Sequence, residues 1–204
     1  MAGLRERKKE QTRQRIAAVA VRLFAERGFD AVTVNEIAEA AEVSKATLFA
    51  YFPSKESLVL GGVAGDDLAA VAAARPPGQS FLAALRDYFR GLAAADVPEA
   101  ELGALITRVR VITGSPALRD AANALLYRQR RELARALARS YGQPAAELIA
   151  AQVAASLLTV QETYFQRLLD GASAPEAARL LARDVELAFD LLEHGISEMA
   201  KGGE

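Results

Sequence analysis

Twenty consecutive residues, Thr33 to Phe52, constrain the fold of this chain more than any other stretch. They open with apolar side chains at the i, i+3, i+4 and i+7 spacing of one helical face: Val34, Ile37, Ala38 and Ala41. Thr33 stands directly before this run and Glu36 comes three residues later, which is the pattern of a capping box. The stretch therefore predicts a short helix that begins after Thr33.

A second short helix is expected after the interruption at Glu42. Ser44 is placed to accept a hydrogen bond from the backbone N–H of Thr47, as an N-cap residue does. Leu48 and Phe52 fall on the side that faces the first helix. The side chains that face away are small, hydroxylated or aromatic: Ala46, Thr47, Phe49 and Ala50. Such a pair of helices is typical of a helix-turn-helix, whose second helix enters the DNA major groove.

The pattern T-V-x-x-I-A-x-x-A-x-V-S-x-x-T-L-x-x-Y-F-x-S-K-E-x-L, over residues 33–58, resembles the DNA-binding domain of the TetR family of transcriptional regulators. Other three-helix cores share such apolar spacing, but from Ile16 to Leu58 nearly every position of the family pattern is filled. Two positions depart from it. Glu42 replaces the usual glycine of the turn, so that a positive φ there strains the backbone. Phe49 replaces the usual tyrosine, whose hydroxyl commonly reaches a DNA phosphate.

The outward face and the resemblance together predict a set of DNA contacts. Phosphate contacts are expected from Arg13, Arg15, Thr33, Ser44, Thr47, Tyr51 and Lys55. By the resemblance, Lys55 holds a phosphate beside a helix N-terminus, with a solvated lysine as the alternative. Base contacts are expected from Lys45 to guanine and from Ala46, Thr47 or Phe49 to thymine methyl groups, with Ala50 on the same face. Base specificity should therefore be modest and supplemented by DNA shape.

Positive charge is concentrated at the start of the chain. Residues 1–15 carry six basic and two acidic side chains, a net charge of +4, whereas residues 57–204 carry 15 basic and 18 acidic side chains. Residues 1–8 are expected to form a mobile basic arm that follows the DNA backbone or enters a minor groove, with a solvated terminus as the alternative. A first helix is expected from Lys9 to Arg27, with Gly28 as its C-cap.

The composition disfavours several classes of protein. The chain has no cysteine, and hence no disulfide or thiolate metal site, which suits the cytoplasm. It lacks the run of about 18 apolar residues that a membrane span needs, and its charged N-terminus is unlike a secretory signal. His194, the single histidine, is expected at the surface or as a helix cap rather than on a metal. Because no Ser-His-Asp set or glycine-rich phosphate loop occurs, we expect no enzyme activity, metal or cofactor.

The remainder of the chain predicts only helices. After Pro53, a helix capped by Ser54 should run to about Ala74, weakened in its middle by three glycines, and should join the DNA-binding head to the body. Residues 75–78, Arg-Pro-Pro-Gly, mark a loop. Further helices are expected at 79–95, 99–113, 116–141, 144–170 and 174–199. The predicted fold is therefore all-α with about nine helices, comprising a helix-turn-helix domain at 1–53 and a ligand-binding and dimerisation domain at 54–204.

The last two predicted helices are apolar over most of their circumference, so they need more partners than one chain of this size supplies. We therefore expect a homodimer, and the resemblance implies a four-helix interface. The expected interface residues are Leu148, Ala151, Ala155, Leu158, Leu180, Leu187 and Leu191. A twofold dimer places two recognition helices one turn of DNA apart, which implies a palindromic operator.

An apolar pocket with a few polar groups is expected in the body, because ligand sites have that composition. The expected lining residues are Leu85, Tyr88, Phe89, Leu92, Leu105, Ile106, Val109, Leu126, Leu157, Gln161, Tyr164 and Phe165. For each of them, packing in an ordinary core is the alternative.

The segment from Arg108 to Ala138 resembles the C-terminal domains of a TetR subgroup linked to acyl-CoA-like ligands. The resemblance implies that the acidic head group of such a ligand contacts five arginines: Arg108, Arg110, Arg128, Arg130 and Arg131. A solvated face paired with Glu132 and Asp120 is the alternative that we favour.

Together these features predict a homodimeric DNA-binding regulator, a repressor that a small lipophilic or acyl-CoA-like effector releases from its operator. Release is implied by the resemblance and requires a ligand that binds one shape of the dimer better than the other. Two other classes stay open. One is a ligand-independent regulator or activator whose cavity is filled by side chains. The other is an enzyme that retains a DNA-binding head, which needs a catalytic constellation that the sequence does not offer.

Overall fold

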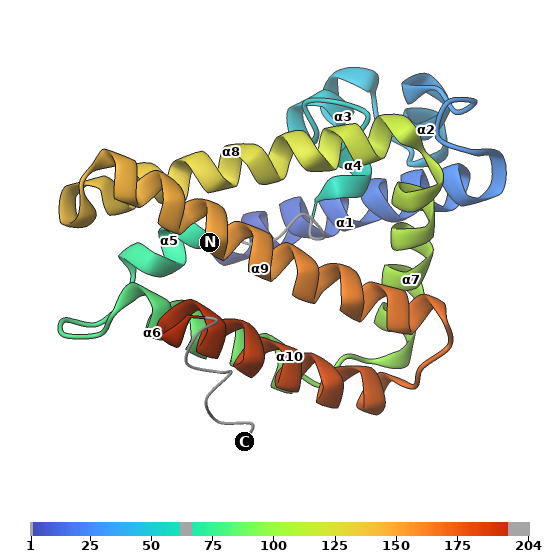
Figure 1. Cartoon of the computed structure of the whole chain (residues 1–204). Coiled ribbons are helices and arrows are strands. Elements are labelled where there is room, and N and C mark those ends of the chain that lie inside the picture. The colour runs from blue at the N-terminus through green and yellow to red at the C-terminus, as the bar shows by residue number, and fades with distance from the viewer. Residues whose placement is uncertain (1, 62–66, 196–204) are drawn as a thin grey trace. The chain divides into compact units, whose positions relative to one another are not determined.

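The computed structural model describes residues 2–61 and 67–195, and these ranges form helices joined by turns and loops, without strands (Figure 1). The all-α fold class is thereby confirmed. The helices in chain order are α1 (Ala2–Arg27), α2 (Val34–Ala40), α3 (Lys45–Tyr51), α4 (Ser57–Leu60), α5 (Leu68–Ala73), α6 (Phe81–Ala94), α7 (Glu99–Gly114), α8 (Pro116–Tyr141), α9 (Gln143–Leu169) and α10 (Ala174–His194). Among these described helices, none is long and apolar enough to cross a membrane.

The N-terminal segment differs from the expected mobile arm. Helix α1 begins at Ala2, so the prediction of an arm is wrong for residues 2–8. The residues from Leu4 to Arg15 are mostly arginine, lysine, glutamate and glutamine, which have high intrinsic helix propensity. The composition that gives this segment its charge therefore also favours its helix.

The single helix predicted over residues 54–74 is also wrong. Helix α4 stops before Gly61, whose backbone is extended with φ −60° and ψ 121°. Helix α5 begins separately, because the Asp67 carboxylate accepts a hydrogen bond from the backbone N–H of Ala70 at 3.0 Å. Glycine costs about 1 kcal/mol in a helix relative to alanine, which accounts for the end at Gly61. The two other glycines of this segment lie outside the described residues.

The later helices follow their predicted ranges closely. Helices α6 to α9 begin and end within two residues of the expected positions. The predicted loop over residues 75–78 is present, and its Gly78 has a φ of 88°. Helix α10 ends at His194 rather than running to residue 199, because Gly195 takes a φ of 74°. Residues 196–199 lie outside the described part of the chain.

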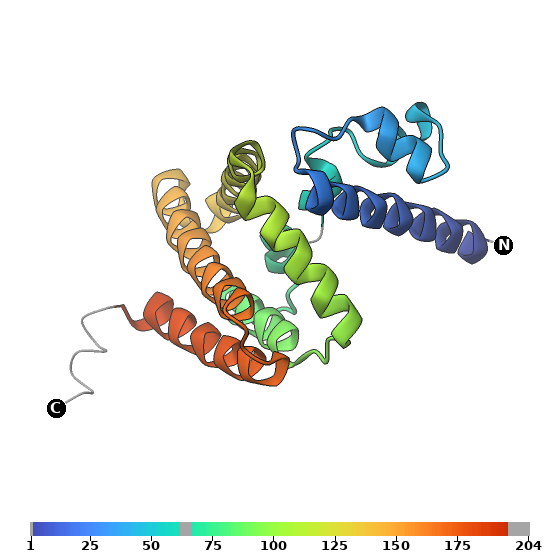
Figure 2. The same cartoon turned by 90° about the vertical axis from the view of Figure 1, so that its right-hand side faces the viewer.

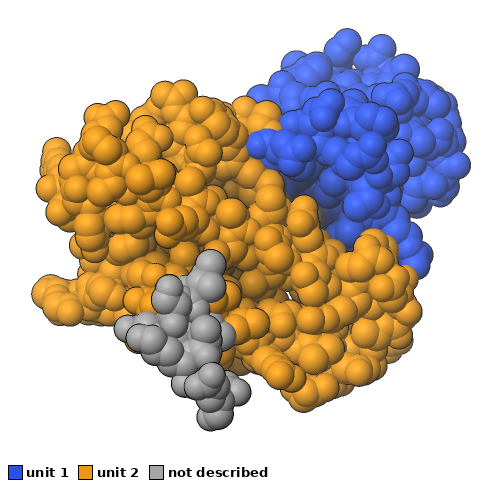
Figure 3. Space-filling model, in the orientation of Figure 1, with its two compact units in different colours: residues 1–64, 103–123 blue, residues 65–102, 124–204 orange. Residues whose placement is uncertain are grey.

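The chain divides into two compact units (Figure 3). Unit 1 comprises residues 1–64 and 103–123, and unit 2 comprises residues 65–102 and 124–204. This division differs from the expected domain boundary after residue 53. The physical reason is that Leu58 and Val59 of α4 are buried in the core of unit 1, in one cluster with Val111 and Leu118.

Unit 1 is built around the long helix α1, which lies along α2 and α4 (Figure 2). Ile37 of α2 and Leu48 of α3 are both fully buried in its core. Gly28 ends α1 with a φ of 85°, and its N–H donates to the Phe24 carbonyl oxygen at 2.9 Å, which confirms the predicted C-cap. The rings of Phe24 and Phe29 then pack with their centroids 5.0 Å apart.

In unit 2, helix α10 packs against both α6 and α9. The core of the unit contains Leu85 of α6, Val153 of α9 and Phe189 of α10, and each of these side chains is at most 1% exposed. Burial of such side chains stabilises a fold by about 1.5–3 kcal/mol each. Unit 2 therefore has a hydrophobic core of its own.

Two arginines of α6 tie this helix to α10. The Arg86 guanidinium donates to the Glu193 carboxylate at 3.0 Å and forms an ion pair with Asp190. Arg90 donates to both carboxylate oxygens of Glu186, at 2.5 and 2.7 Å. The hydrogen bond from Arg90 holds the pKa of Glu186 below its ordinary value. These pairs fix the register of α6 on α10 through charge-assisted hydrogen bonds.

Candidate nucleic-acid interface

The helices α2 and α3 have the caps that their sequence predicts. Thr33 Oγ1 accepts a hydrogen bond from the backbone N–H of Glu36 at 3.3 Å, and the Glu36 carboxylate accepts one from the backbone N–H of Thr33 at 2.7 Å. Ser44 Oγ accepts a hydrogen bond from the backbone N–H of Thr47 at 3.0 Å. The predicted capping box and the predicted N-cap are both confirmed.

Glu36 makes this capping box sensitive to acid. The hydrogen bond from the Thr33 backbone, then that from the Thr33 hydroxyl and the contact with Arg27, lower the pKa of Glu36 from 4.5 to about 2. Because the pKa in the folded state lies below the unfolded value, the carboxylate stabilises the fold fully above pH 4.5. That contribution is lost as the pH falls from 4.5 toward 2.

We expect Glu36→Gln to reduce the loss of stability between pH 4.5 and 2 by the contribution of this one carboxylate, because glutamine cannot titrate. Circular dichroism recorded across the interval measures the profile. Glu39→Gln, an exposed change on the same helix, is the control and should leave the profile unchanged. A titration by NMR that gave Glu36 an ordinary pKa in the folded protein would contradict the assignment.

The turn between α2 and α3 contains the expected backbone strain. Glu42 has a φ of 52°, at the position where the resembling family has glycine. Such a conformation costs a non-glycine residue about 1–2 kcal/mol. It is held by hydrogen bonds from the Glu42 N–H to Glu39 O at 3.0 Å and from the Val43 N–H to Ala38 O at 2.9 Å. The exposed Glu42 carboxylate lies 3.8 Å from Arg15, so it competes with DNA for a predicted phosphate-binding side chain.

Helix α3 directs outward the face that the sequence predicts. Leu48 is fully buried and Phe52 is 3% exposed, whereas Phe49 is 42% exposed. The exposed set on this helix is Lys45, Ala46, Phe49 and Ala50. Thr47 is half-buried, and its hydroxyl lies 2.8 Å from Ser44 Oγ. The orientation of α3 thus agrees with the prediction, while the DNA contacts themselves stay predictions.

A groove beside the end of α3 was missed by the sequence reasoning. Basic side chains of α1, namely Arg7, Lys9 and Arg13, line a cavity of about 600 Å³ together with Ala50 and Tyr51, and two glutamates of α1 also line it. The groove exists because α1 is helical from Ala2 onward. The high helix propensity of the first residues was the signal that could have revealed it.

Lys55 lies elsewhere than the resemblance implies. Its ammonium donates a hydrogen bond to the Phe29 carbonyl oxygen at 2.5 Å and stands 4.2 Å from the centroid of the Phe29 ring. The Phe24 ring centroid is 5.6 Å away. Lys55 is half-buried and is directed into unit 1. It also does not lie in the first turn of α4, which begins at Ser57.

We therefore predict that Lys55→Ala lowers the stability of unit 1 by about 1–3 kcal/mol, through the loss of a charged hydrogen bond and of cation–π contacts. The slope of DNA affinity against salt concentration should stay unchanged. Denaturant unfolding and fluorescence anisotropy at several salt concentrations measure the two quantities. A slope reduced by about one unit would return Lys55 to the set of phosphate contacts.

Seven apolar residues predicted at a dimer interface form what we call the α9–α10 face: Leu148, Ala151, Ala155, Leu158, Leu180, Leu187 and Leu191. Leu148 is 67% exposed, Leu187 is 46% exposed and Leu191 is 36% exposed. Ala155 is also exposed, and the remaining three are half-buried. The described part of one chain therefore leaves this apolar face uncovered.

The twelve predicted pocket residues are not brought together in one unit. Leu105, Ile106 and Val109 belong to unit 1, and the others belong to unit 2. Leu85 and Leu157 are buried in the core cluster of unit 2, as the alternative reading anticipated. Tyr164 and Phe165 pack on each other with ring centroids 5.6 Å apart, and burial raises the pKa of Tyr164. The linings of three cavities in the described part of the chain contain none of the twelve.

The five arginines compared with an acyl-CoA-like site differ in their surroundings. Arg110, Arg128 and Arg131 are exposed, and Arg130 stacks over the Tyr127 ring at 4.6 Å. Arg108 is different, since its guanidinium is half-buried and donates to the Gly61 carbonyl oxygen at 2.8 Å. The sequence did not distinguish Arg108 from the other four.

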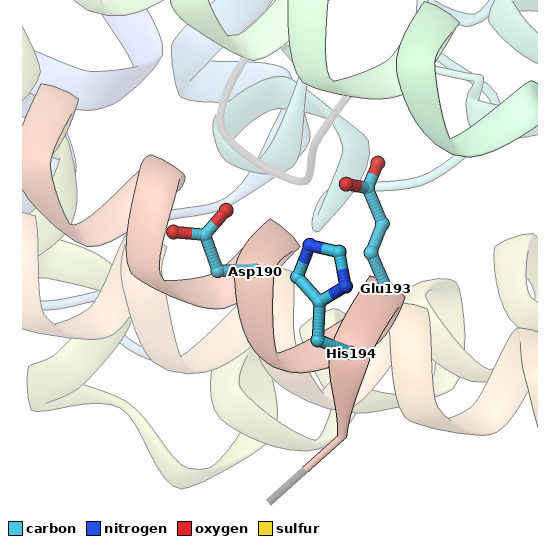
Figure 4. A group of neighbouring side chains, drawn as sticks. All are labelled: Asp190, Glu193 and His194. Atoms are coloured by element: carbon cyan, nitrogen blue, oxygen red, sulfur yellow. The ribbon is translucent and has the colours of Figure 1, made fainter. Parts of the chain in front are cut away.

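His194 lies at the exposed end of α10, as predicted, and groups there with Asp190 and Glu193 (Figure 4). Their ligand atoms lie within 4.8 Å of one another. However, the Arg86 guanidinium pairs with both carboxylates, so the negative charge that a metal needs is already neutralised. We assign Asp190 and Glu193 to the contact between α6 and α10.

A capped recognition helix that presents an exposed face, supported by a buried three-helix core, defines a DNA-binding protein of the helix-turn-helix class. Residues 16–61 match the family model described as bacterial regulatory proteins, tetR family, and residues 79–197 match the model described as MftR C-terminal domain. The chain belongs to the TetR family of bacterial transcriptional regulators and has a C-terminal domain of the MftR type. It is thus a transcriptional regulator and not an enzyme.

Curated relatives match this chain over different lengths. The transcriptional regulator TcmR of Streptomyces glaucescens is 40% identical over 92 residues, which are 44% of this chain and 41% of TcmR. MftR of Mycobacterium tuberculosis is 29% identical over 195 residues, which are 95% of each protein. The similarity to TcmR is therefore local, whereas that to MftR spans both chains.

Two solved structures share the fold. NalD of Pseudomonas aeruginosa, the secondary repressor of the MexAB-OprM multidrug efflux pump, gives a TM-score of 0.56 at 20% identity over 88% of this chain and 97% of NalD. Salmonella enterica GusR gives 0.53 at 20% identity over 92% of this chain and 96% of GusR. At these identities the structures support the fold alone.

Proposed function

We propose that this protein is a cytoplasmic homodimeric repressor that binds a palindromic DNA operator and is released from it by a small lipophilic molecule. The observation that carries the DNA-binding part is the outward face of α3, where Lys45, Ala46, Phe49 and Ala50 are exposed while Leu48 is buried. A helix that packs on the core with one face and exposes the opposite face to solvent can lie in a major groove.

Affinity for the DNA backbone would come from basic and hydroxyl groups around α3. Arg13 and Arg15 on α1 and the caps Thr33 and Ser44 belong to this set, as does half-buried Tyr51. Arg7 and Lys9 join it because they line the groove beside the end of α3. Each phosphate neutralised releases condensed counterions, so binding should weaken steeply with salt.

The homodimer is supported by the exposed α9–α10 face, whose leucines are 36% to 67% exposed in one chain. Large apolar side chains that stay exposed on two neighbouring helices favour an interaction site there. A twofold axis through the face would present two copies of α3 about 34–36 Å apart, one turn of DNA. The operator would then be a palindrome.

Release by an effector is a family expectation, and the alternative is a ligand-independent regulator or activator. One observation favours that alternative: Leu85 and Leu157, both predicted to line the pocket, fill the core of unit 2 instead. An effector can shift the equilibrium between the DNA-binding conformation and the released conformation only by the difference in its affinity for the two. The effector class proposed here remains lipophilic or acyl-CoA-like.

Selection from a random DNA library, followed by sequencing, tests this function directly. We expect enrichment of a palindrome whose half-sites are one helical turn apart, bound by a dimer. Fluorescence anisotropy of the selected DNA then measures affinity, with and without lipophilic extracts of the expressing cells. Enrichment of no sequence over the starting library would refute the proposal.

Lys45 gives the proposal a test at one residue. It is the one long donor among the exposed α3 residues, so Lys45→Ala should remove about 1–3 kcal/mol of preference for guanine at a single operator position. Affinity for each of the four bases at that position, measured by anisotropy, shows the change. Equal weakening on all four would mean that Lys45 contacts phosphate rather than a base.

A further inference from the structure

Unit 1 contains a cavity of about 550 Å³, lined by residues of α1, α4 and α7. This volume lies in the range of small-molecule sites, about 300–1,000 Å³. One wall is made of small apolar side chains of α1, among them Ala17, Ala18 and Val21, and Leu58 of α4 adds to it. The charged side chains of the lining are three arginines, Arg13, Arg22 and Arg108, and two glutamates, Glu10 and Glu26. The cavity thus combines an apolar wall with positive charge.

Arg108 is incompletely satisfied in this cavity. Its Nη1 donates to the Gly61 carbonyl oxygen at 2.8 Å, but its Nε is buried and forms no hydrogen bond within the described part of the chain. Burial lowers the pKa of Arg108, and no carboxylate among its described neighbours offsets that effect. Because buried charged groups in proteins are normally paired, a buried guanidinium nitrogen without an acceptor calls for an external partner.

Arg13 approaches the same place from α1. Its Nη2 lies 3.9 Å from the point where a Cβ on Gly61 would stand, and its guanidinium carbon lies 5.7 Å from the centroid of the Phe52 ring. Among the described residues, neither Arg13 nor Arg108 forms an ion pair. The side chains of Arg13 and Arg108 thus both reach Gly61, which also lines the cavity.

The two carboxylates of the cavity interact with neighbours on α1 that also line it. Glu10 accepts a hydrogen bond from Gln14 at 3.1 Å, and Glu26 forms an ion pair with Arg22 at 3.1 Å. Each pair lies one helical turn apart on α1, as expected for i and i+4 neighbours. Because Gln14 is neutral, Glu10 keeps its negative charge, and the lining carries three arginines against two glutamates. The net charge of the lining is therefore positive, which favours an anion from outside the chain.

We propose that this cavity binds a small amphipathic anion, with its acidic head group on Arg13 and Arg108 and its apolar body against Ala17, Val21 and Leu58. This site would lie in the DNA-binding unit, separate from the pocket predicted in the body. Its effect on DNA rests on the proposed function, because Arg13 is one of the proposed phosphate contacts. An anion that holds Arg13 in the cavity competes with the DNA backbone for the same guanidinium group.

Octanoate is a suitable probe, because it joins a carboxylate to a short apolar chain, and 1-octanol is its uncharged counterpart. Isothermal titration of the full-length protein should show saturable octanoate binding, and binding of 1-octanol should be at least about tenfold weaker. Octyl phosphate distinguishes the two possible head groups of the ligand. If it binds more tightly than octanoate, the site prefers a phosphate; if it binds more weakly, the site prefers a carboxylate. Equal binding of octanoate and 1-octanol would overturn the proposal, as would no saturable binding.

Arg108→Met tests the head-group contact, because methionine keeps much of the apolar stem and removes the guanidinium. It should weaken octanoate binding at least about tenfold. Arg110→Met is the matched control, since Arg110 is exposed on the same helix and does not line the cavity. If Arg108→Met does not fold, Ala18→Phe blocks the apolar wall from an exposed position and should abolish binding. Undiminished octanoate binding by the folded variant would rule the site out.

The consequence for DNA is measured on the selected operator. Saturating octanoate should weaken operator binding by the wild type and leave Ala18→Phe unaffected. Operator binding without octanoate tests the proposed function independently. If the wild type binds its operator but not octanoate, only this inference is contradicted. If it binds octanoate but no DNA, only the proposed function is contradicted.

Discussion

Leu187→Glu is expected to convert the proposed dimer into a monomer and to weaken operator binding by about 100-fold or more. Leu187 is 46% exposed at the middle of the leucines that α10 contributes to the α9–α10 face. In a dimer that closes over this face, a carboxylate at that position loses its water and gains no partner. A monomer then binds one half-site, and the gain of 10²–10⁴ in avidity from two linked sites is lost.

Leu92→Glu is the matched control for this variant. Leu92 is 44% exposed and also belongs to unit 2, but it lies near the end of α6, outside the α9–α10 face. The same substitution at nearly the same exposure should leave the dimer and the operator affinity intact. Sedimentation velocity gives the oligomeric state, and fluorescence anisotropy gives the affinity.

The two variants separate an interface effect from a general one. If Leu187→Glu sediments as a dimer with full affinity, the α9–α10 face is not the interface and the palindrome loses its support. If both variants dissociate equally, added negative charge on unit 2 weakens the association of the dimer irrespective of its position. Only a loss confined to Leu187→Glu agrees with the proposal.

The local chemistry of the helix-turn-helix was predictable from the sequence because each signal acts over three or four residues. Thr33 and Glu36 form the predicted capping box, and Ser44 caps α3 as predicted. In each case a side chain satisfies a backbone group that lies within one helical turn. The family resemblance rests on the same residues, which is why the class of protein was also predictable.

Two predictions about helices were wrong because each followed one property of a segment and neglected another. The charge of residues 2–8 suggested an arm, although their helix propensity favours the helix that is observed. The apolar spacing of residues 54–74 suggested one helix, although Gly61 and the cap at Asp67 end and restart it. In both segments local backbone preference outweighed the pattern that the prediction followed.

The candidate sites were harder to predict because they depend on contacts between distant segments. Lys55 reaches the Phe29 carbonyl oxygen, which is 26 residues away in sequence. Arg108 reaches the Gly61 carbonyl oxygen, which is 47 residues away, and no spacing rule links the two. Apolar periodicity likewise marks Leu85 and Leu157 as buried without distinguishing a core from a pocket wall.

Leu48→Ala is expected to lower the stability of unit 1 and to loosen α3. Leu48 is fully buried in the core, where α3 packs on α2. Removal of a buried leucine side chain costs about 2–5 kcal/mol through lost burial and the cavity that remains. Because small domains have only about 5–15 kcal/mol of stability, α3 should be poorly held and operator binding should fall with it.

Leu133→Ala is the control for Leu48→Ala, since Leu133 is equally buried but belongs to the core of unit 2. Native-state hydrogen exchange reports the stability of each unit separately. Leu48→Ala should lower protection of amides in α2 and α3 and spare those in α9, and Leu133→Ala should do the reverse. Because only the first variant loosens the recognition helix, only it should lose operator affinity while the protein remains folded. Equal loss of protection in both units by either variant would mean that the two cores unfold together, and recognition would then depend on the whole chain rather than on unit 1.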